Sequence, residues 1–308
     1  MKLEEKVGNV RLDYSLYSGK DMYSDGDVED ELLSIVQNFD EDEYGKIIEE
    51  KKSWPILYHL STQRQNIVEW IPISKEDKVL EIGAGCGAIT GALTKKARKV
   101  DCVELSKKRS MINAFRNKKS ENLEIKVGNF QDIEPKLDNK YDYITLIGVF
   151  EYAKSYIGGE QPYTNFLKII LRHLKTGGKL IIAIENKLGL KYWAGCKEDH
   201  LATYFSGLED YQGNTHVRTF SKTELENMFY EVGVNKIKFY YPYPDYKFPN
   251  QIFSDTRLPR NGELSNNIRN FDDDRILLFD ETKVFESILN AKLFPEFSNS
   301  FLVEIEKD

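Results

Sequence analysis

The residues best suited to chemistry form a short glycine-rich segment in the first third of the chain. Gly83, Gly85 and Gly87 occupy alternate positions directly after the apolar run 79–82. A side chain at Gly83 or Gly85 would block the close approach of a ligand to the backbone. A helical pattern follows from about Ala88, and the N-terminus of a helix presents amide donors and the positive end of its dipole. The spacing therefore predicts a ligand-binding turn between a strand and a helix.

Two classes of cofactor use a turn of this kind. Gly83, Gly85 and Ala88 satisfy the G-x-G-x-x-G/A fingerprint of dinucleotide-binding domains. That fingerprint also expects an acidic residue about 20 positions further on, which accepts the ribose hydroxyls, and Glu104 lies there. Sites for S-adenosylmethionine (SAM) share this geometry, so the spacing alone leaves a nicotinamide dinucleotide and SAM open.

A second set of reactive residues follows the fourth and fifth predicted strands. Glu151 comes shortly after the apolar run 141–147, and His200 follows the run 180–184 next to Asp199. Ligands of parallel sheets bind at the carboxyl ends of the strands. We predict that Glu151 is a base or an acceptor-binding residue, and that His200 is a general base whose basicity Asp199 increases. A helix-capping carboxylate and a surface histidine are the alternatives.

The elements that must position these residues alternate between strands and helices. Short apolar runs predict strands at 78–82, 100–105, 123–127, 141–147 and 180–184, and the late segments 236–241 and 301–305 predict two more. Strands separated by helices form a parallel sheet, and runs without alternation are buried on both faces. The two late strands lack a crossover helix, which indicates an antiparallel last strand. We therefore expect an α/β Rossmann-like fold with a seven-stranded, mostly parallel sheet.

Other regions flank this sheet. Residues 1–74 are predicted to form a helical lid or brace, with one helix through 32–36 and a second from Ser53 to Trp70. The main domain is expected at 75–308, with insertions at about 186–220 and at 243–299, the latter directly before the last strand.

Composition narrows the classes of function. The chain has 308 residues, 41% of them hydrophobic, and a net charge of −7. That charge argues against nucleic acid as the main partner. No apolar run reaches the ~18 residues of a membrane span, and the three cysteines lack metal-binding spacing. The run Asp272-Asp273-Asp274 is interpreted as a solvated turn, so no metal site is predicted. We expect a cytoplasmic protein with free thiols.

Several motifs together resemble class I SAM-dependent methyltransferases. The segment from Glu81 to Gly87 resembles their first motif, and the similarity continues in register through 103–105, 128–132, 141–146 and 174–180. The resemblance covers roughly residues 75 to 240 and the last strand, and it implies SAM as the cofactor.

The same resemblance implies a role for each matching residue. Glu81 would orient the glycine turn or reach the cofactor amine through water, and Gly83, Gly85 and Gly87 would admit the methionine part. Glu104 would accept the ribose hydroxyls. Three residues would surround the adenine, and these are Leu105, Asn129 and Phe130. Gly148 would pass close to the sulfonium, and Arg64 is interpreted as a surface residue, with contact to the cofactor carboxylate as the alternative.

Shorter segments resemble bacterial methyltransferases associated with surface-polysaccharide assembly. These segments are 23–27, 185–195, 198–200 and 242–247. The resemblance implies O-methylation of a sugar hydroxyl of a glycan or related acceptor, possible glycosyltransferase modules as partners, and acceptor-side roles for the two insertions. A small-molecule or peptide methyltransferase and a non-catalytic SAM-binding assembly module remain alternatives. A dinucleotide-dependent oxidoreductase is disfavoured by the antiparallel last strand.

Overall fold

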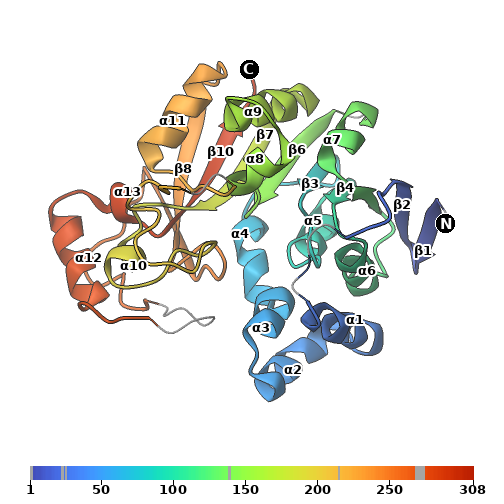
Figure 1. The fold of residues 1–308 in the computed structure, drawn as a ribbon, viewed down its shortest axis with the longest axis horizontal. Helices are drawn as coiled ribbons and strands as arrows, with labels where there is room; N and C mark the ends of the chain where they lie inside the picture. Colours follow the sequence, from blue (N-terminus) through green and yellow to red (C-terminus); the bar gives the residue numbers. More distant parts are fainter. Residues whose placement is uncertain (1–2, 22–23, 25, 138–139, 214–215, 268–274) are drawn as a thin grey trace. The chain divides into compact units, whose positions relative to one another are not determined.

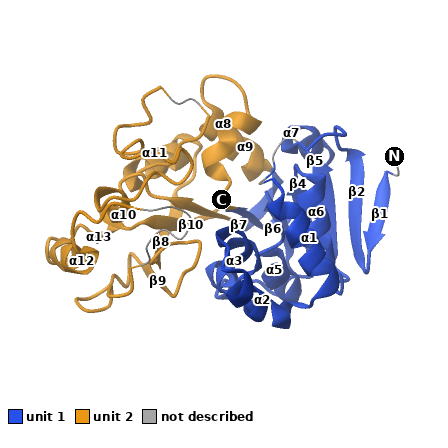
Figure 2. Cartoon of the chain, turned by 60° about the horizontal axis from the view of Figure 1, so that its bottom comes forward, with its two compact units in different colours: residues 1–146, 173–178 blue, residues 147–172, 179–308 orange. Residues whose placement is uncertain are grey.

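The computed structural model describes residues 3–21, 24, 26–137, 140–213, 216–267 and 275–308. The chain divides into two compact units (Figure 2). Unit 1 comprises Met1–Leu146 and His173–Gly178, and unit 2 comprises Ile147–Arg172 and Lys179–Asp308. The acidic run at 272–274 lies outside the described residues, as do Tyr23 and Asp25.

Parallel strands form the centre of unit 1, as the sequence predicts. The strands are β3 (Lys78–Ile82), β4 (Lys99–Glu104), β5 (Leu123–Gly128) and β6 (Tyr141–Ile147), and their order is β5-β4-β3-β6 (Figure 1). The helices that follow the first three are α5 (Thr90–Lys96), α6 (Lys107–Arg116) and α7 (Phe130–Ile133). Apolar side chains such as Val79 and Leu80 are fully buried, because helices and neighbouring strands exclude water from both faces of the sheet.

The N-terminus differs from the prediction of helices alone. It begins with a hairpin of β1 (Glu4–Val7) and β2 (Val10–Leu16), and β2 pairs in parallel with β5. Val10, Leu12 and Tyr14 alternate with more exposed residues and are buried, a period of two that is typical of a half-buried strand. With β9 in unit 2, this hairpin brings the described strands to ten, so the predicted number of seven is wrong.

Helices follow the hairpin and pack together within unit 1 (Figure 1). They are α1 (Val28–Asn38), α2 (Tyr44–Lys51), α3 (Trp54–Leu60) and α4 (Asn66–Glu69). The predicted single helix from Ser53 to Trp70 is broken, because Ser61 is extended and its side chain caps a new 3-10 turn at Thr62–Gln65. The apolar side chains of α1 to α3 share one cluster with Cys86 of the glycine segment and Ile112 of α6.

Antiparallel pairing dominates unit 2. The strands are β7 (Leu174–Glu185, from Lys179 onward), β10 (Ser300–Glu306), β8 (Lys236–Tyr243) and β9 (Gln251–Ser254), in the order β7-β10-β8-β9. The predicted antiparallel last strand is confirmed, since β10 runs antiparallel to both β7 and β8. β7 begins at Leu174 and not at Leu180 as predicted.

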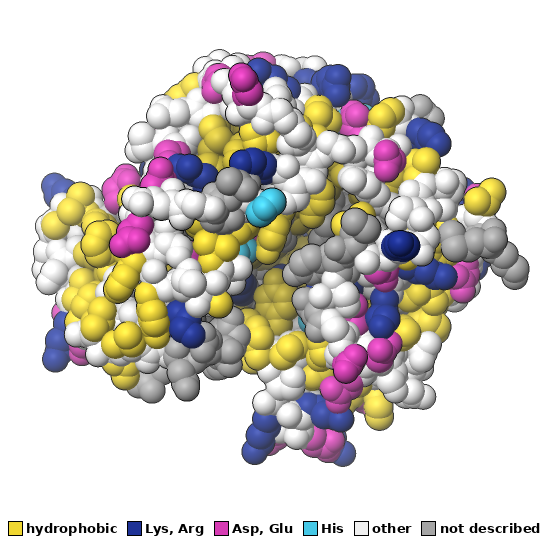
Figure 3. Space-filling model, in the orientation of Figure 1, with side chains coloured by type: hydrophobic (Ala, Val, Ile, Leu, Met, Phe, Trp, Pro, Cys, Tyr) yellow, Lys and Arg dark blue, Asp and Glu magenta, His cyan; other side chains and the backbone are white. Residues whose placement is uncertain are grey.

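Short helices and irregular segments complete unit 2. The helices are α8 (Ala153–Tyr156), α9 (Pro162–His173, up to Arg172), α10 (Leu190–Trp193), α11 (Lys222–Glu231), α12 (Glu281–Asn290) and α13 (Phe294–Phe297). Hydrophobic side chains gather on the surface over the α12 region in Figure 3. In the segment that precedes α12, Ile276, Leu277 and Leu278 are exposed. Across the described ranges, no helix is long and apolar enough to cross a membrane.

One buried carboxyl group links three elements of unit 1. Glu81 on β3 accepts hydrogen bonds from Thr90 Oγ1 of α5, at 2.6 Å, and from Cys102 Sγ of β4, at 3.3 Å. Burial raises the pKa of Glu81 from 4.5 to about 7, although both hydrogen bonds oppose the shift. A carboxyl group in this position holds its proton in the folded protein at pH values where the unfolded chain has lost it.

The raised pKa of Glu81 predicts how stability depends on pH. Its contribution to the free energy of unfolding falls as the pH rises from about 4.5 to about 7, because the folded state binds the extra proton in that window. In Glu81→Gln this dependence is absent. We expect the stability advantage of the wild type over the variant to shrink by about 2 kcal/mol between about pH 5 and pH 7.5, measured by urea unfolding. The exposed control Glu121→Gln should follow the wild type; parallel curves for Glu81→Gln would contradict the prediction.

Candidate functional site

The glycine turn between β3 and α5 has the backbone conformation that the sequence predicts. Gly83, Gly85 and Gly87 have φ values of +71°, +52° and +77°, in the left-handed region that favours glycine. A Cβ at Gly85 would meet no other atom within 4 Å, whereas one at Gly87 would lie 2.5 Å from Asn113 Oδ1 of α6. The lack of a side chain at Gly85 therefore leaves one side of the turn open. Gly87 allows the turn to pack closely against α6.

Glu104 ties this turn to the end of the neighbouring strand. Its Oε2 accepts a hydrogen bond from the Gly85 amide at 2.7 Å, and its Oε1 accepts one from the Ser106 amide at 2.9 Å. The side chain is buried, and burial raises its pKa although the backbone donors oppose this. The Leu105 amide also donates to this carboxylate. Since a carboxylate offers about four acceptor positions, about one remains for a hydroxyl group of a ligand.

The other residues expected around a cofactor lie in unit 1, at the ends of β4 and β5. Leu105 is half-buried directly after Glu104. Asn129 caps α7, because its Oδ1 accepts a hydrogen bond from the Gln131 amide at 3.1 Å, and Phe130 is buried. Glu81 bonds to Thr90 and Cys102, so its contacts support the start of α5 and are not directed to a ligand through the turn.

Arg64 is buried, so its predicted position on the surface is wrong. It lies in the 3-10 turn between α3 and α4 and is 6% exposed, so it is not a surface arginine. Its guanidinium lies 3.7 Å from the centre of the Tyr58 ring and donates to the Tyr58 carbonyl at 3.3 Å. Within the described part of the chain, its Nε has no hydrogen-bond partner. To predict the burial of Arg64 from the sequence, one would have had to predict the break in the helix at Ser61.

These groups of unit 1 fit the parts of SAM. Glu104 suits the ribose hydroxyls, the open side of Gly85 admits a backbone-bound amino-acid chain, and Leu105 offers an apolar surface for the adenine. Arg64 supplies a buried cation that suits the carboxylate of the methionine part. The fit rests on Gly85, where a Cβ would fill the open side of the turn.

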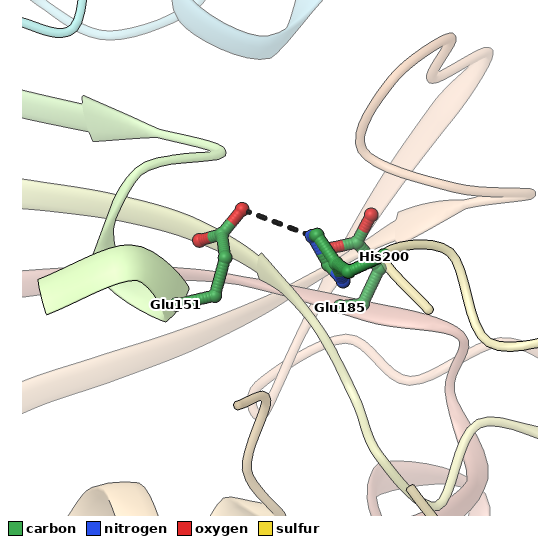
Figure 4. Close-up of side chains that lie close together, drawn as sticks. All are labelled: Glu151, Glu185 and His200. Carbon is green, nitrogen blue, oxygen red and sulfur yellow. Dashed lines mark ion pairs between the residues drawn. The ribbon is translucent and has the colours of Figure 1, made fainter. Parts of the chain in front are cut away.

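A second cluster of buried polar side chains lies in unit 2. Glu151 follows β6 in a 3-10 turn, Glu185 ends β7, and His200 lies in the irregular segment after α10. His200 Nε2 is 3.5 Å from Glu151 Oε1 and 3.9 Å from Glu185 Oε2. Figure 4 shows the Glu151 carboxylate directed at the imidazole ring. The structure therefore brings together Glu151 and His200, which the sequence analysis selected separately, and adds Glu185.

Glu198, and not Asp199, orients the imidazole of His200. Glu198 Oε1 lies 3.0 Å from His200 Nδ1, and Glu198 Oε2 accepts hydrogen bonds from the amides of His200 and Leu201. Burial lowers the pKa of His200, but the three surrounding carboxylates raise it well above its ordinary value. Burial also raises the pKa of Glu151. The predicted pairing with Asp199 is wrong, because adjacent residues need not face each other.

Asp199 belongs instead to a network of buried charges beside this cluster. It pairs with Lys191 at 2.9 Å and with Lys247, and Lys247 Nζ also lies 2.7 Å from Glu185 Oε1. Lys191 is further paired with Asp245 at 2.8 Å. Buried charges are tolerated only when they are paired in this way, so the two lysines hold the acidic segment around His200 in place.

Gly148 lies close to this cluster and not in the glycine turn. It has a φ of +69°, and a Cβ there would lie 2.7 Å from the Tyr246 hydroxyl. Its amide donates to the Ala183 carbonyl at 2.9 Å. Within unit 2, Gly148 is therefore required by the close approach of the Tyr246 hydroxyl. The expected position of Gly148 near a sulfonium stays a prediction.

A cavity of about 360 Å³ lies in unit 2 near the backbone of Glu151. Tyr163 and Arg218 line it, and both donate to the Glu151 carbonyl, through the Tyr163 hydroxyl at 3.3 Å and the Arg218 amide at 3.1 Å. Its lining also includes Phe220, Glu160 and Glu231. Aromatic and charged groups around a cavity of this size suit a polar small molecule.

Comparison with known proteins agrees with this geometry. A family model described as a methyltransferase domain matches residues 56–238. An uncharacterized methyltransferase of Staphylococcus carnosus is 31% identical over 50% of this chain and 66% of its own length. The ribosomal RNA small subunit methyltransferase A of Syntrophus aciditrophicus is 27% identical over 47% and 50%, respectively. The chain thus spans between half and two thirds of these relatives.

A solved structure extends the comparison to the fold. The SAM-dependent methyltransferase from Archaeoglobus fulgidus superposes with a TM-score of 0.50 at 13% identity, covering 83% of this chain and 100% of that one. The family match spans the glycine turn, Glu104 and His200. This chain belongs to the methyltransferase domain family.

Proposed function

We propose that this methyltransferase acts on a hydroxyl group of a sugar or of a related polar acceptor. The observation that carries the proposal is the buried cluster in which His200 faces Glu151 and is oriented by Glu198. A neutral hydroxyl is a weak nucleophile and needs a group that accepts its proton. Acceptors that are already anionic, such as a thiolate or a carboxylate, have a lone pair available without this help.

The proposed reaction forms one bond and breaks another. Bound SAM supplies an electrophilic methyl group on a sulfonium. The acceptor oxygen forms a bond to the methyl carbon as the sulfur–carbon bond breaks, and the hydroxyl proton passes to the carboxylate of Glu151, which faces His200. The side chains of His200 and Glu151 are only 8% and 1% exposed, which limits the water that would otherwise compete for that proton.

The cavity near Glu151 supports a saccharide as the acceptor. Tyr163 and Phe220 offer ring faces, while Arg218, Glu160 and Glu231 offer hydrogen bonds to hydroxyl groups. The resemblance of the segments 185–195 and 198–200 to methyltransferases of surface-polysaccharide assembly favours a glycan, with glycosyltransferase modules as partners. A small-molecule or peptide acceptor would use the same cofactor residues and differ in this cavity.

Gly85→Ala tests the cofactor site. A methyl group would point into the open side of the turn, so we expect SAM binding, measured by calorimetry, to weaken at least about 10-fold, which corresponds to about 1.4 kcal/mol. Gly262→Ala is the matched control, because Gly262 also has a left-handed φ and open space around its Cα. Equal SAM affinity in both variants would contradict the assignment of the glycine turn.

Arg64→Gln tests whether the buried guanidinium binds the cofactor carboxylate. We expect the variant to bind S-adenosylhomocysteine about 10-fold more weakly, because it loses a charge-assisted hydrogen bond. The affinity for 5′-methylthioadenosine, which lacks the amino-acid part, should be unchanged. If both ligands lose affinity equally, Arg64 supports the site only through packing.

His200→Gln and Glu151→Gln test the proposed chemistry. With methyl-labelled SAM and a panel of nucleotide sugars and oligosaccharides, we expect the wild type to label a sugar. Each variant should lower kcat by about 100-fold or more while SAM affinity is unchanged, because a positioned proton acceptor contributes about 100-fold to 10,000-fold. His216→Gln, at an exposed histidine, is the control. Labelling of peptides or other small molecules but of no sugar would overturn the acceptor, and SAM binding without transfer to any class would favour an assembly module.

A further inference from the structure

We propose that Glu151, Glu185 and His200 form a binding site for one divalent transition-metal ion. Each side chain offers one ligand atom, and these atoms all lie within 4.8 Å of one another. They come from three separate segments of the chain, the turn after β6, the end of β7 and the segment after α10 (Figure 4). No spacing motif therefore reveals the site in the sequence, from which we predicted no metal.

The distances between the ligand atoms suit a shared cation better than direct hydrogen bonds. His200 Nε2 lies 3.5 Å from Glu151 Oε1 and 3.9 Å from Glu185 Oε2, which is too long for good hydrogen bonds. Nitrogen and oxygen ligands bound at about 2.1 Å around a tetrahedral ion are about 3.4 Å apart. Small side-chain movements would bring all three atoms to that separation.

Unused acceptor atoms are the independent observation that points to a ligand. Glu151 Oε2 and both carboxylate oxygens of Glu185 accept no hydrogen bond within the described residues, and the two side chains are 1% and 0% exposed. Lys247 compensates only Glu185, through the ion pair at Oε1. A buried carboxylate without donors is costly, and a cation between the two carboxylates would remove that cost.

The orientation of His200 also matches that of a metal ligand. Its Nδ1 faces Glu198 Oε1 at 3.0 Å. If Nδ1 donates its hydrogen to this carboxylate, Nε2 presents its lone pair toward Glu151 and Glu185. Metal-bound histidines are commonly held in this way by a carboxylate on their other nitrogen. Glu198 is thus a positioning residue for the proposed site.

The ligand types narrow the choice of metal. One imidazole and two carboxylates suit Zn²⁺, Mn²⁺, Fe²⁺ or Co²⁺, whereas Mg²⁺ and Ca²⁺ prefer oxygen ligands alone. Three protein ligands leave at least one coordination position open, as in catalytic zinc sites. In a role that rests on the proposed function, the acceptor hydroxyl occupies that position. The metal then lowers the hydroxyl pKa, and the proton passes to the free Oε2 of Glu151 when the oxygen attacks the methyl carbon.

Metal titration of the full chain tests the site without any acceptor. After treatment with a chelator, the wild type should bind one equivalent of Co²⁺ or Mn²⁺ by calorimetry, and the visible spectrum of the Co²⁺ form should show low coordination by nitrogen and oxygen. Glu185→Gln and His200→Gln should each weaken binding by about 100-fold or more. Glu198→Gln should cost about 10-fold, as losses of supporting carboxylates do.

Matched controls make the outcomes decisive. His216→Gln and Glu263→Gln, at residues outside the cluster, should bind the metal as the wild type does, and unchanged SAM affinity would show that each variant is folded. No binding by the wild type, or binding that both ligand substitutions leave intact, overturns the site. If labelled methyl transfer to a sugar proceeds equally well in the chelated protein, the metal has no catalytic role, while the proposed function stands. If the metal binds but no sugar is labelled, the metal site stands and the proposed function is contradicted.

Discussion

The hydrogen bond from the Gly85 amide to Glu104 Oε2, 2.7 Å long, is the contact that organises the proposed cofactor site. It joins the turn after β3 to the end of the adjacent strand β4. The left-handed backbone of the turn allows the amide to point toward the carboxylate, and the lack of a side chain at Gly85 leaves the other side open. One interaction therefore positions both the open turn and the carboxylate proposed to accept the ribose hydroxyls. The helix α6 and the N-terminal helices share an apolar cluster with this segment through Ile112 and Cys86.

Several charged side chains are buried in the interior of unit 2, where their removal from water costs free energy. Glu151, Glu185 and Glu198 are buried with His200, and Lys247 is paired with both Glu185 and Asp199. Such an arrangement contributes little to stability, because the desolvation of each ion offsets its pairing. Perturbed buried groups of this kind are concentrated at functional sites. The free-energy cost of burying these charges is therefore consistent with a role in binding or chemistry. A hydrophobic core of the same volume could not fulfil such a role.

The parts of the fold that could be predicted are those with a strong local pattern. The four parallel strands of unit 1 were located within one residue at each end, because each is a short segment with several apolar residues between polar turns. The hairpin of β1 and β2 was missed although Val10, Leu12 and Tyr14 alternate, since such a short pattern gains its strand character by pairing with β5. In the same way, the burial of Arg64 depends on a break at Ser61 that helical periodicity did not reveal.

The sequence by itself determined the position and backbone conformation of the glycine turn between β3 and α5. Its glycines, Glu81 and Glu104 lie on consecutive elements, and a βαβ unit brings the ends of adjacent parallel strands together regardless of detail. Only the tertiary structure decided the partners of His200. Glu151 and Glu185 reach it from two other segments and Glu198 from its own, while neighbouring Asp199 turns to Lys191 and Lys247. Contacts between distant segments depend on how irregular chain packs on the sheet, and no periodicity in the sequence encodes that packing.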